Sequence, residues 1–335
     1  MLSGLLVAAV ALAAVFAWTN GVHDTANAIA TALSTGALTP RFGLALATVL
    51  NFLGALLGID VALTVGGIVA VPPGAAGVSM VAAALLAAIG WNLLTWWLGL
   101  PTSSSHALLA GLVGAGLVAG ATVDGASVTG QVVVPTLLSP VVGLVLAWAA
   151  VAALGGAAAG WSRRMTLRRL KIAHSVAAGA VALGHGLQDG QKTMGAIVLA
   201  LVAAGRLQGP DVVPLWVRLL AAVFLALGTA FGGWPLVRTL GRRVAPLDAL
   251  GGFAAQGTTA VVLYVAGVVG APISSTQTVT AAVAGAGAAG GVRPVRWRHV
   301  RWLVVRRILA AWVLTPVVCG IAAAALLALL LLAGL

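Results

Sequence analysis

The chain consists of long apolar runs that are interrupted at only a few places by polar residues or by clusters of arginine. The runs are about 20 residues long or longer and apolar on every side, which predicts membrane-spanning helices instead of the alternating strands of a barrel. The first run continues from Leu2 to Leu38 and would be roughly 55 Å long as a helix, well beyond a hydrocarbon core of about 30 Å. We therefore expect this segment either to break or to run far out of the bilayer, with Gly21 and its polar neighbours as the natural point for a break.

The polar interruptions occur twice, in the same order and at nearly the same separation. The segment Gly21–Asn27 (GVHDTAN) returns as Gly186–Lys192 (GLQDGQK), with Asp24 and Asp189 lying 165 residues apart. Two further pairs of polar segments follow at similar separations: Pro101–His106 with Pro272–Gln277, and Ser139–Val142 with Thr315–Val318. This recurrence predicts a tandem duplication that covers nearly the whole chain.

The amino-acid composition shows whether these apolar runs lie in water or in a lipid bilayer. Hydrophobic residues make up 61% of the chain and charged residues 7%, whereas a soluble domain has about 25% charged residues. The chain cannot cover itself with a polar surface, so we predict an integral membrane protein in contact with a lipid bilayer. The net charge of +12 does not indicate nucleic acid, because the basic residues lie in loops beside apolar spans, where they set membrane topology.

Arginine and lysine gather in three clusters, at residues 163–171, 238–243 and 293–307. Basic loops stay in the cytoplasm, and placing all three there gives about five crossings in each half, with both chain ends outside. An odd number of crossings orients the two halves oppositely, which is the inverted repeat of many secondary transporters. Such sites lie near the membrane midplane, between the repeats.

The predicted fold is therefore all-α, with about 10–12 transmembrane helices in two inverted-topology repeats that contain broken helices or re-entrant hairpins. We expect the first repeat at residues 1–160, a basic cytoplasmic linker at 161–171 and the second repeat at 172–335.

Two runs of hydroxyl residues carry the first candidate chemistry. Each follows a proline and precedes an apolar run rich in glycine and alanine, so each is expected to begin a helix. A helix N-terminus offers free N–H groups and the positive end of its dipole, and both favour anions. Two such termini converging from inverted halves would hold a tetrahedral oxyanion. The residues concerned are Ser103, Ser104, Ser105, Ser274, Ser275 and Thr276.

The duplicated acidic motifs supply the second group of candidate functional residues. A carboxylate in hydrocarbon is expensive and indicates function; Asp24 and Asp189 could coordinate a cation, accept a hydrogen bond from a protonated anion or take up a proton. Asn27 and Gln191 can add neutral oxygens. Lys192 aligns with Asn27, and it could neutralise substrate charge, replace a bound cation or simply pair with Asp189 on one helix face.

A different class remains open at this point, an intramembrane metal-dependent hydrolase that would use His23, Asp24, His185 and Asp189. The inverted duplication argues against it, and the histidines do not have the spacing of a zinc-protease motif. A passive anion channel is a further alternative. The single cysteine, Cys319, excludes a disulfide framework.

At these residues the chain resembles a known family. Gly21–Ala28 is similar to the G-x-N/H-D-x-A-N-A signature of the inorganic phosphate transporter (PiT) family, and His185–Gly195 resembles the second copy found in bacterial members. Pro101–His106, Gly252–Gln256 and Pro272–Thr276 also match family motifs. The resemblance implies a dimeric secondary transporter of the bacterial low-affinity phosphate permease type, in the plasma membrane, importing inorganic phosphate by symport with H⁺ or Na⁺.

This interpretation predicts alternating access, with no cofactor and no enzymatic activity. Asp24, Asn27 and Asp189 would bind the coupling ion. The residues predicted to bind phosphate are Thr25, Ser103, Ser104, Ser105, Gln191, Lys192, Ser274, Ser275 and Thr276.

Three departures from the family pattern concern the coupling ion. His23 and Gln188 stand where asparagine commonly precedes each aspartate, and Lys192 replaces the second asparagine. They argue against a symmetric pair of sodium sites and slightly favour protons. Within the same fold, sulfate is the rival substrate, but fully ionised sulfate cannot donate a hydrogen bond to a carboxylate as hydrogen phosphate can.

Overall fold

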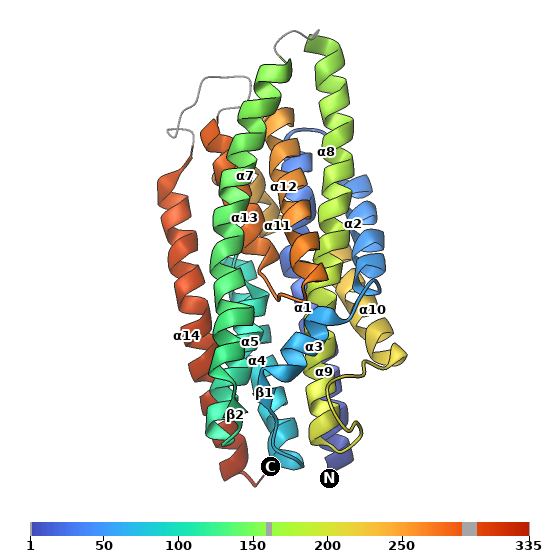
Figure 1. Ribbon diagram of the computed structural model, residues 1–335, viewed down its shortest axis with the longest axis vertical. Coiled ribbons are helices and arrows are strands. Elements are labelled where there is room, and N and C mark those ends of the chain that lie inside the picture. The colour runs from blue at the N-terminus through green and yellow to red at the C-terminus, as the bar shows by residue number, and fades with distance from the viewer. Residues whose placement is uncertain (1, 159–162, 290–299, 335) are drawn as a thin grey trace.

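The computed structural model describes residues 2–158, 163–289 and 300–334. In these residues the fold is a bundle of helices with one small sheet, in which β1 (Val69–Ala70) pairs antiparallel with β2 (Thr122–Val123). Figure 1 shows the helices running mainly along one axis, with both ends of the chain at the bottom of the view. The all-α architecture predicted from the apolar runs is confirmed.

The described residues of the first half of the chain form seven α-helices and one π-helix. They are α1 (Leu2–Ser34), α2 (Pro40–Ala55), α3 (Asp60–Gly67), α4 (Ala75–Leu98), α5 (Ser104–Val118), α6 (Gly125–Ser127), the π-helix η1 (Val128–Val133) and α7 (Val134–Ala158). Those of the second half are α8 (Arg163–His185), the π-helix η2 (Gly186–Gly190), α9 (Gln191–Ala203), α10 (Leu215–Phe231), α11 (Trp234–Arg238), the π-helix η3 (Thr239–Arg243), α12 (Ala249–Val268), α13 (Ser275–Ala289) and α14 (Trp302–Leu332).

By length and composition, five helical segments of the described chain could each cross a membrane, and up to seven could if each bent pair counts as one span. The bent pairs are α2 with α3, at 65°, and α10 with the segment Trp234–Arg243, at 60°. Further expected crossings fall on helices shorter than the roughly 20 residues that a bilayer requires, such as α5 and α13 with 15 residues each. The chain is a multi-pass membrane protein with broken helices.

The break expected at Gly21 is wrong, because α1 is one continuous helix of 33 residues. Gly21 serves a different purpose: a Cβ there would lie 2.2 Å from the carbonyl oxygen of Leu225 in α10. The missing side chain lets two backbones meet instead of letting one bend. In the second half the corresponding motif does depart from a regular helix, since Gly186–Gly190 forms the π-helical turn η2.

Two such close crossings join the halves. At the α1–α10 crossing, a Cβ on Gly228 would lie 2.0 Å from the Trp18 carbonyl oxygen. At the α2–α8 crossing, a Cβ on Gly54 would lie 2.0 Å from the Leu183 carbonyl oxygen, and one on Gly186 would lie 2.2 Å from that of Asn51. Small residues that let helix backbones approach are the usual means of helix association in lipid.

We expect Gly228→Ala to destabilise the protein by about 1–3 kcal/mol, the usual range for overpacking, because the added methyl meets backbone and not a movable side chain. Gly90 in α4 is the matched control, since a Cβ there would meet nothing within 4 Å. Gly90→Ala should raise stability by roughly 0.4–1 kcal/mol. Thermal unfolding in detergent measures both, and equal melting temperatures for the two variants would contradict this account of the crossing.

The packing of the two halves is reciprocal. Helix α7 of the first half packs on α13 of the second, and α14 of the second half packs on α5 of the first. In the same way α1 packs on α10 while α8 packs on α2, and α1 packs on α4 while α8 packs on α12. Each half therefore packs extensively against the other, in addition to the packing within each half.

The basic clusters lie away from the two chain ends. Arg301, at the start of α14, donates its backbone N–H to the carbonyl of Val244 just after η3, at 3.0 Å, so the second and third clusters meet. The middle of α8 contacts the segment just after α1, where Ser175 Oγ donates to the Ala37 carbonyl at 3.1 Å. The expected linker forms part of α8 from Arg163 onward; its residues 161 and 162, like basic residues 293, 296 and 298, lie outside the described residues.

Candidate functional site

Two buried carboxylates meet near the middle of the bundle. Asp24 of α1 and Asp189 of η2 come together around His185, the last residue of α8. The Nε2 atom of His185 lies 2.7 Å from Asp189 Oδ2 and 3.6 Å from Asp24 Oδ2. No more than 1% of any of the three side chains is exposed. The sequence motifs that are 165 residues apart thus form one ionic cluster.

The hydroxyl runs begin helices, as the prolines before them predict. Ser103 is the N-cap of α5, and its Oγ accepts the backbone N–H of His106 at 3.1 Å. Ser274 precedes α13, and its Oγ accepts the backbone N–H of Gln277 at 3.2 Å. Both hydroxyls therefore satisfy helix N–H groups that would otherwise lack partners.

The hydroxyls that follow these caps face the carboxylates. Ser104 Oγ donates to Asp24 Oδ2 at 3.4 Å, and Thr276 Oγ1 donates to Asp24 Oδ1 at 3.0 Å. Ser275 Oγ donates to Asp189 Oδ2 at 3.2 Å. The starts of α5 and α13 therefore converge on the same pair of carboxylates, from opposite halves of the chain.

Asn27 and Lys192 connect each motif to the hydroxyl run of the other half. Asn27 Nδ2 donates to Thr276 Oγ1 at 3.0 Å and to Ser275 Oγ at 3.4 Å. Lys192 Nζ donates to Ser105 Oγ at 2.5 Å. These two positions align in the duplication, so an amide holds one turn and an ammonium holds the other.

Lys192 is among the largest fully buried side chains of the described residues. Besides Ser105, its Nζ contacts Asp189 Oδ1 at 2.5 Å and the Ile273 carbonyl at 2.6 Å. The ion pair with Asp189 that was one of the alternatives is present, but the ammonium also contacts Ser105 of one hydroxyl run and the Ile273 carbonyl directly before the other. It is thus placed at the centre of the predicted anion site.

Two predicted site residues face other parts of the fold. Thr25 Oγ1 donates to the carbonyls of Gly21 at 2.6 Å and Thr229 at 3.2 Å, towards α10. Gln191 Oε1 accepts the backbone N–H of Val61 at 2.8 Å, at the start of α3. Among the described residues, neither forms a hydrogen bond with the ionic cluster, because neighbouring residues on a helix point in different directions.

Three residues around the cluster were not predicted. Asn51 Oδ1 lies 3.0 Å from His185 Nδ1, and Thr95 Oγ1 lies 3.2 Å from His23 Nε2. His23 Nδ1 in turn lies 2.6 Å from Asp24 Oδ1. Ile273 contributes its backbone carbonyl. Asn51 and Thr95 could have been noticed as polar residues within apolar spans, whereas nothing in the sequence distinguishes the carbonyl of Ile273.

Asp24, His185 and Asp189 could also hold a metal ion, since their ligand atoms lie within 4.8 Å of one another. The donor set fits such an ion poorly. The Lys192 ammonium contacts Asp189, and a fixed positive charge at that carboxylate opposes a second cation. The arrangement suits an anion better, with hydroxyl and ammonium donors beside carboxylates that can accept a proton or a hydrogen bond.

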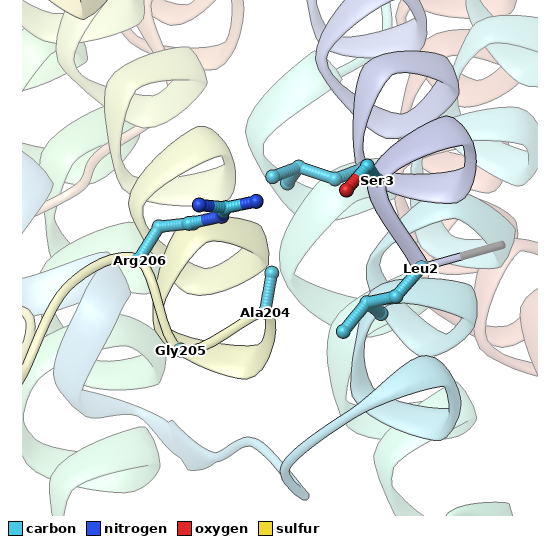
Figure 2. A pocket seen from close by; sticks show the side chains of 6 residues that line it. Leu2, Ser3, Ala204, Gly205 and Arg206 are labelled. Carbon is cyan, nitrogen blue, oxygen red and sulfur yellow. The ribbon is translucent and has the colours of Figure 1, made fainter.

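The pocket in Figure 2 is a separate feature of about 200 Å³. Leu2, Ser3 and Leu6 of α1 line it together with Ala204–Arg206, just after α9. Leu6 precedes Asp24 by 18 residues of continuous helix, or roughly 27 Å. This pocket is therefore not the ionic cluster, although it shows that the start of α1 and the end of α9 lie together.

Comparison with known proteins places this geometry in a family context. The phosphate transporter family matches residues 20–159 and 153–323. A protein of Rhizobium meliloti named "probable low-affinity inorganic phosphate transporter" is 39% identical over 93% of this chain and 92% of its own length. One of the same name from Mycobacterium tuberculosis is 38% identical over 96% of this chain and 76% of its own.

A solved structure named "the sodium-dependent phosphate transporter" has a similar fold. It superposes with a TM-score of 0.85 over 98% of this chain and 99% of its own, at 24% identity. This likeness concerns the fold alone.

Proposed function

This chain belongs to the phosphate transporter family, and we propose that it imports inorganic phosphate together with H⁺ or Na⁺ through alternating access. The family transports its substrate and performs no enzymatic reaction on it, so the hydrolase alternative is set aside. The convergence of two hydroxyl-bearing helix starts and one ammonium on a buried carboxylate pair is the observation that carries the proposal.

Phosphate would be held by the donors that surround the carboxylates. Ser104, Ser105, Ser275 and Thr276 supply hydroxyl groups, and Lys192 supplies a charged donor for the phosphate oxygens. In the structure these donors are bonded to Asp24, to Asp189 or to one another, so the anion would exchange places with contacts that already exist. Ser103 and Ser274 already accept a helix N–H at their hydroxyl oxygens. We therefore assign them to supporting the helix starts and not to direct contact with phosphate.

The carboxylates favour phosphate over sulfate. A singly or doubly protonated phosphate carries hydroxyl groups that can donate to Asp24 or Asp189, whereas sulfate at neutral pH has none. Each carboxylate would otherwise lie against anionic oxygens in a medium of low dielectric constant, where repulsion is large. Sulfate should therefore bind more weakly than phosphate, because it would leave a buried carboxylate without a hydrogen-bond donor.

Charge also explains why a cation should accompany the anion. Among the described residues, the buried ionisable groups other than histidines and Cys319 are Asp24, Asp189 and Lys192, so the cluster is already negative when its histidines are neutral. An incoming phosphate makes it more negative, and uncompensated charge inside a membrane is costly. A proton or a sodium ion that enters with phosphate would balance it.

Alternating access would follow from an inverted repeat, to which we assign the two halves. The bent pairs α2–α3 and α10–α11 occupy equivalent places, and Pro140 in α7 and Pro316 in α14 do so as well. The segment just after α1 meets the middle of α8 at Ser175, and Asp24 of α1 meets His185 at the end of α8, so the two first helices of the halves run in opposite directions (Figure 1). Movement of one part of such a repeat pair against the other exposes a central site to either side in turn.

We further propose that the protein lies in the plasma membrane of a bacterium as a homodimer, with its basic clusters in the cytoplasm and both ends outside. The joined second and third clusters lie far from the ends in Figure 1, which supports this orientation. Labelling of single cysteines at either end by impermeant reagents tests the orientation, and subunit counting by photobleaching tests the dimer.

The transport proposal is tested by uptake of radiolabelled phosphate into proteoliposomes, with a Na⁺ gradient and a pH gradient imposed separately. We expect accumulation against the phosphate gradient under one of them, and that gradient identifies the ion. Labelled sulfate serves as the control substrate. Accumulation of sulfate in place of phosphate would overturn the assignment of phosphate as the substrate. Equilibration of phosphate without accumulation would indicate a channel.

A further inference from the structure

Three polar residues beside the ionic cluster have no hydrogen-bond partner among the described residues. Asn20 of α1 and Asn92 of α4 lack partners at both side-chain atoms, and Thr193 of α9 lacks one at its hydroxyl. The exposed fractions are 0% for Asn20, 1% for Asn92 and 0% for Thr193. Buried polar groups are almost always paired, so unpaired ones call for an explanation.

The three residues lie at one level of the bundle. Asn20 precedes Asp24 by four residues and Thr193 follows Asp189 by four, so each shares a helix face with its carboxylate, about one turn away. Asn92 similarly precedes Thr95 by three, and Thr95 contacts His23. The remaining question is whether the three turns lie on the same side of the cluster.

Contacts at the far ends of the helices answer it. The Gly74 N–H just before α4 donates to the Ala203 carbonyl at 2.7 Å, where α9 ends. The start of α1 meets the segment after α9 at the pocket in Figure 2. Helices α1 and α4 therefore run from that end towards the cluster, and α9 runs back to it. Since α1, α4 and α9 pack pairwise, Asn20, Asn92 and Thr193 lie at one level of three adjoining helices.

The duplication shows that this polarity is not required for packing. Asn20 aligns with His185, whose ring nitrogens are engaged by Asn51 and Asp189. Thr193 aligns with Ala28, and Asn92 aligns with Leu263 at the separation of the hydroxyl motifs. The equivalent region of the other half is thus apolar or fully paired.

The two equivalent crossings differ in the residue at the point of closest approach. The turn after His185 meets α2 at Asn51, whereas the turn after Asn20 meets α10 at Leu225. Asn51 supplies a side-chain oxygen to His185 at its crossing, whereas the side chain of Leu225 has no donor or acceptor to offer. The asymmetry belongs to the side chains, since both crossings have the same backbone approach.

We propose that Asn20, Asn92 and Thr193 form a binding site for a dehydrated monovalent metal cation, Na⁺ being the probe of choice. The two amide oxygens and the hydroxyl oxygen are hard, neutral ligands. Sites for divalent cations recruit carboxylates directly, whereas here the nearest carboxylate of α1 is one turn away. A single positive charge at this level would offset the excess of carboxylates over ammonium in the cluster.

A separate cation site is also consistent with the crowding around the carboxylates. Asp189 is engaged by Lys192, His185 and Ser275, which leaves little room for a metal ion there. The cation would bind beside the pair and act on it through space. The inference rests on the proposed function only in identifying this cation as the coupling ion.

The test is equilibrium binding of ²²Na⁺ to the purified full-length protein in detergent, with choline replacing sodium at constant ionic strength. We expect saturable binding in the wild type and a loss of affinity of about tenfold or more in Asn92→Leu and Thr193→Ala, as for other losses of metal-site support. Both variants copy the residues of the other half. Because Asn92 has no partner to lose, its isosteric replacement by leucine should leave the fold intact.

Ser79→Ala is the matched control. Ser79 is also buried in α4 and unpaired among the described residues, but it precedes Asn92 by 13 residues, or roughly 20 Å. Wild-type binding in Ser79→Ala supports the assignment. Unchanged affinity in Asn92→Leu, or no binding in the wild type, overturns the site.

Phosphate uptake distinguishes this failure from failure of the proposed function. Phosphate uptake driven by a pH gradient alone, without Na⁺ binding, would support the proposed transport function and contradict the cation site. If Asn92→Leu weakens Na⁺ binding but phosphate accumulates under no gradient, the cation site is supported and the proposed symport is contradicted.

Discussion

Replacing Lys192 with methionine should lower the free energy of unfolding by about 3–5 kcal/mol, the cost of breaking a buried ion pair at one partner. Methionine keeps much of the volume but removes the donor that contacts Asp189, Ser105 and the Ile273 carbonyl. Asp189 would then be a buried charge without its ammonium partner. Unfolding followed in detergent micelles gives the measurement.

The matched control is the exposed Lys171 in the first half of α8, where the same substitution should change stability by no more than about 0.5 kcal/mol. The double variant Lys192→Met/Asp189→Asn should recover most of the loss, because it removes both charges. Recovery separates the ion pair from a packing defect. Equal effects at Lys171 and Lys192, or no recovery in the double variant, would contradict the structure of the cluster.

Asp24→Asn should lower the initial rate of phosphate uptake by about 100-fold or more, equivalent to the roughly 3 kcal/mol that a hydrogen bond to a charged group contributes. The amide preserves the shape of the carboxylate but carries no charge and can take up no proton. It also places an NH₂ group against His23, Ser104 or Thr276, which now bond to carboxylate oxygens. Proteoliposomes with matched protein content provide the rates.

Asp124→Asn is the control for that substitution. Asp124 caps α6 with its carboxylate, which accepts the N–H groups of Ala126 and Ser127, and asparagine is an equally good cap. Uptake by this variant should equal that of the wild type. If Asp24→Asn also transported at the wild-type rate, the carboxylate pair would have no part in transport and the proposed site would lie elsewhere.

The sequence was most informative where residues were both rare and repeated. A carboxylate within an apolar run attracts notice because of its cost in lipid, and finding Asp24 and Asp189 in copies of one motif placed them together. The family and the all-α membrane fold are confirmed. The roles of the individual site residues stay predictions, to be tested as above.

Reasoning from the sequence failed where the direction of a side chain mattered. Thr25 and Gln191 were grouped with their motif neighbours, yet they bond to Thr229 and Val61. The break expected at Gly21 is absent because glycine was interpreted as a point of bending. Whether a glycine bends a helix or admits another helix depends on what lies opposite it, here Leu225.

The sequence by itself determined that this protein spans a membrane, that its polar motifs recur in the same order and which polar residues share a helix face, because these depend on composition and spacing along one chain. Only the tertiary structure decided that Asn27 holds the hydroxyl run of the second half, that Lys192 holds that of the first, and that Asn20, Asn92 and Thr193 lie at one level. The physical reason is that contacts between helices depend on where the helices cross. In this protein glycines such as Gly21 and Gly228 fix those crossings, and their partners lie about 200 residues away.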